Sequence, residues 1–386
     1  MKKVYTMDET MAEYRQQFYN LYHQTIAPMF REFEKERKTN LITAILLSLL
    51  FLFISVVVAL DMFGISGNTP KTSDFVFILK TIISIIAFIL AIVVPFYFNN
   101  KFVAKLKYSC MDKILRLFGN VRWYDETDVI DNQDLIASDL FSVFTNREAY
   151  DGFNGVYKDV PLQISETYLY HVSGSGKNKR VVSVFNGVVI KFLSNKDIRN
   201  KTIIATKGDN KIRGGANIPF LSSVLILISV IVYSMIKNGV NMATIFSCAI
   251  VAYQVLIPLA ILYLFVKVFP KLTKKEYLNE IKLEDSEFSK KYKVYSSDQI
   301  EGRYLITPGF MERFKNMQTA FGTKNIKCSF YGDSLMFAIS TRKNLFEIGN
   351  LFYSLENPKQ LQTFFNELTS IFILIDYFKL NEKTGL

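Results

Sequence analysis

Four long runs of uncharged, mostly apolar residues divide the chain. They are residues 39–60, 81–100, 214–236 and 238–266, which contain 22, 20, 23 and 29 residues. A helix rises about 1.5 Å per residue, so about 20 residues cross the roughly 30 Å hydrocarbon core of a bilayer. Each run is therefore long enough to span a membrane. The pattern predicts four transmembrane helices in two hairpins, and four buried core helices in one soluble protein are the weaker interpretation.

Lysine and arginine residues gather on one side of these runs. The positions on this side are Lys35, Arg37, Lys38, Lys101, Lys105, Lys107, Lys113, Arg116, Lys267, Lys271, Lys274 and Lys275. The opposite side has Lys71, Lys80 and Lys237. Loops rich in Lys and Arg stay in the cytoplasm. We therefore expect both termini and the long central segment to be cytoplasmic.

Residues 6–38 have the pattern of an amphipathic helix. It begins at a capping box, Thr6 to Glu9, and Pro28 should kink it. Its charge is balanced, because residues 1–40 contain 7 basic and 6 acidic side chains. We expect its apolar face to pack on the soluble part of the protein, with a helix lying on the membrane surface as the alternative. The apolar positions are Tyr14, Phe18, Leu21, Tyr22, Thr25, Met29 and Phe33.

The remaining polar stretches mix helix and strand patterns. Residues 101–122 look like a basic continuation of the second apolar helix, and residues 283–314 contain Thr307 followed by Pro308, which favours a helix start. Strand patterns cover 155–172 (broken by Pro161), 181–193 (with a bend or bulge at Asn186 and Gly187), 201–205, 326–331 and 334–341. Hairpin loops are predicted at 173–180 and 332–333, and further helices at 307–320 and 358–380.

These elements predict five consecutive segments. They are a cytoplasmic helical stalk (1–40), a first transmembrane hairpin (41–100), a basic helix with the first part of an α+β domain (101–213), a second hairpin (214–267) and the second part of the domain (268–386). The two soluble parts together have enough residues for one packed α+β domain. We expect the second hairpin to be inserted into this domain. Two separate small domains are the alternative.

Composition and charge narrow the function classes. Half of the residues are hydrophobic and the net charge is +11, but the basic excess is spread over all soluble segments. Nucleic-acid binding, which needs a concentrated basic surface, has little support. The chain has three cysteines, Cys110, Cys248 and Cys328, and two histidines, His23 and His171, all far apart. This spacing does not match a structural zinc site.

The most suggestive polar cluster contains Asp298, Glu301 and Arg303. Asp298 and Glu301 are three residues apart, so they could share one helical face beside the arginine. Such a group can form a structural ion-pair and capping network, a surface for a partner, or an acid–base pair. The structural interpretation is favoured, and the cluster is the candidate interaction surface.

Gln254 and Pro258 interrupt the fourth apolar run. Proline cannot donate to the carbonyl four residues earlier, which is that of Gln254, so a kink is expected there. A packing kink is the favoured interpretation, and a solute or gating site is the alternative. No charged residue lies inside any of the four runs, which argues against a proton-coupled pump.

Two other motifs have simple interpretations. Residues 124–140 hold six acidic and no basic residues, but no EF-hand register supplies both the glycine and the final glutamate, so helix-capping acids are favoured over calcium ligands. Residues 173–180 superficially suggest a phosphate-binding loop. They lack the first glycine, and a strand rather than a helix follows.

Two blocks of the chain resemble a bacterial membrane family known as domain-of-unknown-function family 3137. The specific block is 283–314, and Gly155 to Leu162 and Phe185 to Val189 fit an upstream block. The N-terminal hairpin preceded by a polar helix also fits, whereas the second hairpin, 214–266, departs from the usual pattern. The resemblance implies a bacterial inner membrane location and a LemA-type membrane protein as a partner, and it implies no activity.

The sequence therefore predicts an α-helical membrane protein with four transmembrane helices and one cytoplasmic α+β domain split by the second hairpin. We expect the domain to act as a protein-interaction or scaffold module that binds another protein, such as a membrane protein, or the inner leaflet of the lipid bilayer, with no catalytic residues, cofactor or metal. The alternative is a transport or channel component that acts as a homo-oligomer. A membrane-anchored hydrolase is a distant third.

Overall fold

The centre of the molecule is one antiparallel sheet of nine strands. The computed structural model describes residues 7–62, 74–194, 198–209, 278–321, 325–341 and 345–378. The strand order is β1-β2-β3-β4-β9-β8-β5-β7-β6. The strands are β1 (Asn120–Asp125), β2 (Asn146–Tyr157), β3 (Val160–Ser173), β4 (Arg180–Leu193), β5 (Thr202–Thr206), β6 (Asn279–Ile281), β7 (Tyr292–Ser296), β8 (Ile326–Tyr331) and β9 (Ser334–Ser340). Strands from both sides of residues 210–277 thus form a single sheet.

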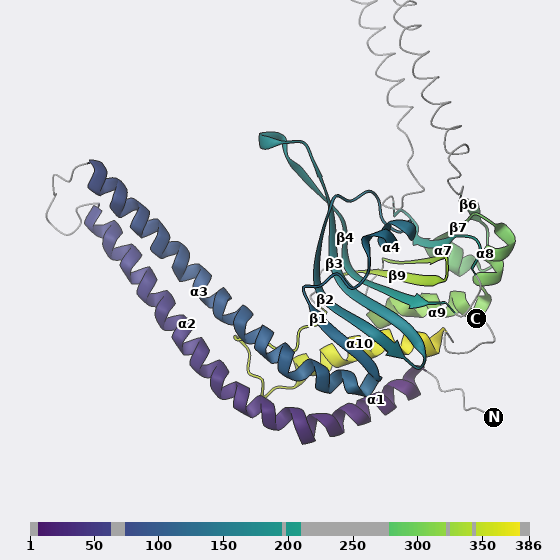
Figure 1. Cartoon of the computed structure of the whole chain (residues 1–386), viewed down its shortest axis with the longest axis horizontal. Coiled ribbons are helices and arrows are strands. Elements are labelled where there is room, and N and C mark those ends of the chain that lie inside the picture. The colour runs from purple at the N-terminus through teal and green to yellow at the C-terminus, as the bar shows by residue number, and fades with distance from the viewer. Residues whose placement is uncertain are drawn as a thin grey trace, which may run out of the picture.

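Helices cover both faces of this sheet (Figure 1). One face packs against α10 (Lys359–Tyr377), α1 (Met7–Leu21) and the end of α3 (Asp74–Leu115), through a large core that includes Phe118, Phe337 and Phe372. The other face forms a smaller core with α4 (Asn132–Ala137), which contains Leu135, Leu169 and Val189. The short helices α7 (Ser286–Lys291) and α8 (Gln299–Leu305) lie near the β6 and β7 edge. Helix α9 (Pro308–Phe321) contributes to the large core, where Phe310 contacts Phe330 of β8.

The N-terminal helix packs on the sheet domain, which confirms the predicted role of its apolar face. The ring of Phe18 stacks on Phe365 of α10 at a centroid distance of 4.0 Å. The Tyr14 hydroxyl lies 2.6 Å from that of Tyr157. A π-helical turn, η1 (Tyr22–Ile26), separates α1 from α2 (Ala27–Met62), and the path bends there (Figure 1). Pro28 lacks an N–H group, so a local break just before it is expected.

Helices α2 and α3 form a long antiparallel pair that extends away from the sheet (Figure 1). Each contains a segment long and apolar enough to cross a membrane. Two candidate spans are therefore found in the described part of the chain, against four predicted. The other two predicted spans, together with Gln254 and Pro258, lie outside the described residues.

Three local expectations were wrong. The helix after the second apolar run ends at Leu115, and a 3-10 turn (Arg116–Phe118) and Gly119 (φ +90°) lead into β1, where a helix was expected to 122. The segment around Pro161 is two strands joined by a tight turn at Lys158 and Asp159, which both have positive φ. The register shift of β4 against β3 falls at Val184, so it is not at Asn186 and Gly187.

Gly187 has another role. A Cβ at this position would lie 2.1 Å from the Ile339 carbonyl oxygen of β9, and its φ is +152°. The glycine therefore permits the close approach of β4 and β9 at the centre of the sheet.

Local signals predicted several other elements correctly. The Thr307 hydroxyl accepts from the Phe310 N–H at the start of α9. The β8–β9 hairpin turns at Gly332 and Asp333, the β3–β4 hairpin turns within 173–180, and α10 lies within 358–380.

Candidate functional site

In the uncharged zone of the α2–α3 pair, large apolar side chains lie on the outside and small side chains lie at the contact between the helices. In residues 39–60 and 81–100 the buried residues are Ala44, Ser55, Ala87 and Ala91. Large aliphatic and aromatic side chains point outward, for example Phe53, which is 65% exposed. A water-soluble helix pair would bury these large side chains. Small residues at the helix contact and large apolar residues outside are typical of helices packed in lipid.

Hydroxyl groups and ion pairs complete the contact between the two helices. The Ser55 hydroxyl donates to the Ser84 carbonyl oxygen at 3.0 Å, and that of Ser48 donates to the Ala91 carbonyl. At the far end of the zone the Lys80 Nζ lies 2.5 Å from Asp61. At the near end Lys105 Nζ lies 2.7 Å from Glu36. Charges thus pair across the helices just outside each end of the uncharged zone.

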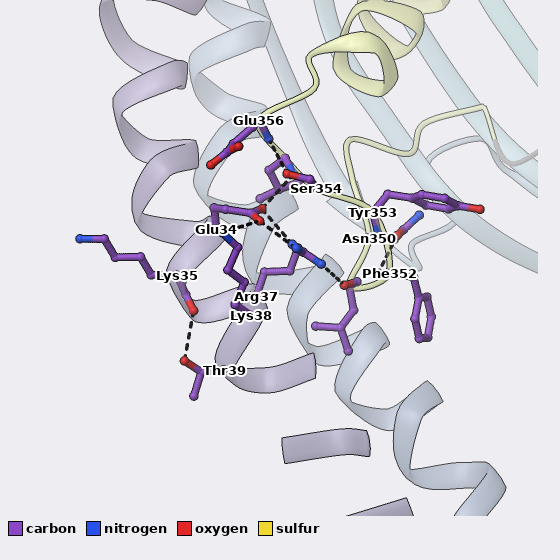
Figure 2. Close-up of polar contacts among 12 residues, drawn as sticks. Glu34, Lys35, Arg37, Lys38, Thr39, Asn350, Phe352, Tyr353, Ser354 and Glu356 are labelled. Atoms are coloured by element: carbon purple, nitrogen blue, oxygen red, sulfur yellow. Dashed lines mark hydrogen bonds and ion pairs between the residues drawn. The ribbon is translucent and has the colours of Figure 1, made fainter. Parts of the chain in front are cut away.

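A buried ion pair joins this helical pair to the C-terminal part of the domain (Figure 2). Arg37 donates to both oxygens of Glu34 at 2.8 Å, and both side chains are buried. Glu34 Oε2 also accepts the Leu355 N–H at 3.0 Å. The bidentate hydrogen bonds from Arg37 lower the pKa of Glu34 to about 2, although burial opposes this shift.

The same pair fixes the segment 350–356. Arg37 Nη1 donates to the Leu351 carbonyl oxygen at 2.7 Å, and the Leu351 N–H donates to Asn99 Oδ1 at 3.0 Å. Both polar groups of one backbone residue are therefore held by α2 and α3 together. We call Glu34, Arg37, Asn99, Leu351 and Leu355 the hairpin clamp. Sequence reasoning missed it, and the sole local signal was the i,i+3 spacing of Glu34 and Arg37.

A second buried charge cluster lies where α3 meets the sheet. Lys107 Nζ is 2.5 Å from Asp151 Oδ2, and the Trp123 indole donates to Asp151 Oδ1 at 2.7 Å. Burial raises the pKa of Asp151 despite the lysine ammonium. Nearby Glu166 accepts the Leu345 N–H at 3.3 Å. Burial and the carboxylate of Asp151 raise the pKa of Glu166 to about 7.

Asp298 and Glu301 of the predicted cluster have structural contacts. Asp298 is the N-cap of α8, and its carboxylate accepts the N–H groups of Ile300 and Glu301 at 2.7 and 3.0 Å. The Glu301 carboxylate accepts the Arg199 N–H at 2.8 Å and the Asn200 side-chain amide at 2.5 Å. Glu301 therefore holds the segment before β5 against α8.

Arg303 is exposed on α8, three residues after Ile300, which is 83% exposed. Tyr304 is 65% exposed on the same helix. Positions three and four apart share a helical face. The outer face of α8 thus presents Ile300, Arg303 and Tyr304, and the two acids lie on its inner side.

The acidic run 124–140 forms ion pairs and caps with the sheet domain. Asp131 caps α4, Asp134 lies 2.6 Å from Lys191 Nζ, and Asp139 lies 2.5 Å from Lys201 Nζ. Arg147 pairs with Asp128 at 3.1 Å and is itself buried against Ser165 and Thr167. In the described ranges no group of three or more His, Cys, Asp or Glu side chains is placed to hold a metal ion.

Burial makes the two described cysteines poor nucleophiles. It raises the pKa of Cys110 to about 12, and Cys328 is also fully buried with a raised pKa. The predicted hairpin loop at 173–180 joins β3 and β4, so no helix N-terminus follows it to receive a phosphate.

Comparison with known families matches residues 183–380 to the family described as protein of unknown function (DUF3137). The match covers just over half of the chain. The chain belongs to the DUF3137 family. The matched range includes the block 283–314 and the second part of the upstream block, 185–189. It begins after the first part of that upstream block, 155–162. Neither the curated proteins nor the solved structures give a match.

In this DUF3137 protein the match includes β5 to β9 and the segment that contacts Arg37. It leaves out α1, and also α2 and α3, which provide Glu34, Arg37 and Asn99 of the hairpin clamp. The family description supplies no activity.

Proposed function

We propose that this protein is a non-enzymatic, multi-pass protein of the bacterial inner membrane whose α+β domain is a binding module for another protein. The observation that carries the membrane assignment is the reversed burial of the α2–α3 pair, with alanine and serine at its centre and Phe53 and similar side chains outside. The runs 214–236 and 238–266 add two further spans in this proposal.

Charge supports a cytoplasmic position for the sheet domain and both termini. Lys35, Lys38 and Lys101 are exposed at the domain end of the uncharged zone. At the other end, the Lys80 ammonium is neutralised by Asp61. Lys38 also lies 3.7 Å from Glu34, but its side chain remains 60% exposed. An excess of exposed basic side chains on the domain side favours retention of that side in the cytoplasm.

The outer face of α8 is the proposed binding surface. A large aliphatic side chain that is 83% exposed, beside an arginine and a tyrosine, has the composition of interface centres. Asp298 and Glu301 position this face by capping α8 and fixing the chain before β5. A LemA-type membrane protein, which the family resemblance implies, is the first partner to test.

The test compares two variants of the full-length tagged protein in its native host membrane. Ile300→Asp with Arg303→Glu changes the α8 face, and Val143→Asp changes an exposed apolar residue elsewhere. We expect a stoichiometric partner to purify with the parent chain and with Val143→Asp, but not with the α8 variant. Rebinding of the purified partner to purified parent chain must reproduce the difference. Equal binding by both variants would overturn the α8 assignment, and a homo-oligomer without a partner would overturn the binding-module proposal.

A further inference from the structure

The hairpin clamp holds a pair of exposed aromatic residues beside the apolar zone. Phe352 and Tyr353 follow Leu351 directly and are 49% and 71% exposed. Their backbone N–H groups both donate to Asn350 Oδ1 at 2.9 Å. The turn that presents them is therefore ordered by its own hydrogen bonds and by the clamp, so their exposure is built into the fold.

The position of this turn along the helices follows from the clamp residues. Asn99 is one residue from the end of the uncharged run, and Lys101 is the next charged residue. Arg37 lies two residues before Thr39, where the uncharged run of α2 begins. At about 1.5 Å of rise per residue, both contacts to Leu351 come from within roughly one helical turn of the ends of the runs.

The side chains point in directions that suit this position. In Figure 2, α2 runs from Glu34 to Thr39 toward the apolar zone, and the ring of Phe352 points the same way. Tyr353 extends to the side, away from Glu34 and Arg37 (Figure 2). On α3 itself, Phe96 and Tyr97 lie within one helical turn of Asn99, and each is 60% exposed.

We infer that Phe352 and Tyr353 form an interfacial anchor, which inserts into the headgroup region of the same bilayer that α2 and α3 span. Aromatic side chains concentrate at this depth because their rings are apolar while a tyrosine hydroxyl stays hydrated. The exposed ammonium groups of Lys38 and Lys101 lie at the same level and complement anionic headgroups. The anchor would fix the tilt of the sheet domain relative to the membrane. This inference rests on the proposed membrane span.

Tryptophan scanning with brominated lipids tests the anchor. Full-length Phe352→Trp, Tyr353→Trp, Phe53→Trp and Ile300→Trp are each reconstituted in phosphatidylcholine–phosphatidylglycerol vesicles. The phosphatidylcholine is brominated either near the headgroup or near the chain ends. The signal of the parent chain, which contains Trp123, is subtracted. All four positions are exposed, so the substitutions leave the core unchanged.

We expect the emission of Phe352→Trp and Tyr353→Trp to fall most with bromine near the headgroup. Phe53→Trp should respond to bromine within the chains, and Ile300→Trp on α8 should respond to neither. If Phe53→Trp is quenched while positions 352 and 353 behave like position 300, the anchor is wrong and the span stands. If Phe53→Trp is not quenched, the span itself is wrong, and the anchor fails with it.

Discussion

Glu34 and Arg37 show how this protein buries charge beside an apolar zone. Burial of an ion pair is tolerated when hydrogen bonds replace the lost water. Here the carboxylate accepts from Arg37 and from the Leu355 N–H, and the guanidinium also donates to the Leu351 carbonyl. The pair thereby supplies hydrogen-bond partners to backbone groups of a segment about 300 residues away in the sequence (Figure 2). Its contribution is to connect two parts of the fold.

Replacing Arg37 by methionine should therefore be strongly destabilising. It leaves the buried Glu34 carboxylate without the guanidinium that donates to both of its oxygens, which costs about 3–5 kcal/mol in comparable buried pairs. The neighbouring change Lys38→Met removes the same charge from a side chain that lies 3.7 Å from Glu34 but is 60% exposed. Because exposed ion pairs contribute little, it should cost no more than about 0.5 kcal/mol. Denaturant unfolding of the detergent-solubilised protein measures both. Equal losses for the two variants would show that the pair does not hold the segment.

Protonation of Glu166 should make the stability of the folded protein depend on pH. Its pKa in the folded protein, about 7, lies above the ordinary value of 4.5, so the folded state binds more protons than the unfolded state between these values. Stability therefore falls as pH rises through this window, by at most about 1.4 kcal/mol per pH unit from this group. The charges that face it are Asp151, Lys107 and Glu367.

Glu166→Gln should remove this loss. We expect the variant to be more stable than the parent chain at pH 8, with a difference that fades as the pH approaches 4.5. Thermal unfolding at a series of pH values gives the comparison, and Glu284→Gln, a change at an exposed position, serves as the control. If the difference in stability between the parent chain and Glu166→Gln stayed the same from pH 5 to pH 8, the result would contradict the assignment.

At the scale of elements, prediction from sequence succeeded where the signal was local. The start of α9 at Thr307 and Pro308, and the turn at Gly332 and Asp333, depend on neighbouring residues and were found. The turn at Lys158 and Asp159 was missed because it has positive φ without a glycine or asparagine to mark it. β1 was missed because its pairing with β2 is a tertiary contact, and its basic approach resembled a helix.

The candidate site was predictable to a smaller extent. The spacing of Asp298 and Glu301 led to the expectation of a structural capping network, and Asp298 does cap α8. It gave no sign of the segment at Arg199 and Asn200 that Glu301 holds. The contact between Arg37 and the Leu351 carbonyl joins residues 314 positions apart, so no local pattern could reveal it.

Packing of α2 against α3 depends on small side chains at their contact. Ala87 is buried there, and Ile86 is exposed on the outer side. Ala87→Leu should push the helices apart and cost about 1–3 kcal/mol, as overpacking does in well-packed contacts. Ile86→Leu, which keeps the volume of an outward side chain, should change stability by less than about 0.5 kcal/mol. Far-UV circular dichroism during heating in detergent measures both. A tolerated Ala87→Leu would mean that the two helices do not pack closely at this point.

At the scale of the whole molecule, the α2–α3 pair and the sheet domain are joined at several independent points. The hairpin clamp, the Lys107–Asp151 ion pair and the packing of α1 on α10 all lie at the base of the pair. Figure 1 shows α8 at the end of the sheet remote from the α2–α3 pair. A surface on α8 is thus held in a defined position relative to the helices, which suits a module that presents one face to a partner.

In the proposed topology, the domain and the link between α2 and α3 lie on opposite sides of the membrane. We expect Ile300→Cys to react with a membrane-impermeant maleimide in inverted inner-membrane vesicles but not in spheroplasts. Ser66→Cys, in the link between the two helices, should show the reverse pattern. The parent chain, whose described cysteines Cys110 and Cys328 are buried, gives the background. The helices α2 and α3 are antiparallel, and each is long enough to span a bilayer. If each helix crosses the membrane once, the link and the domain lie on opposite sides. Labelling of both positions in the same preparation would therefore contradict the hairpin span, and the reverse of the expected pattern would contradict the orientation alone.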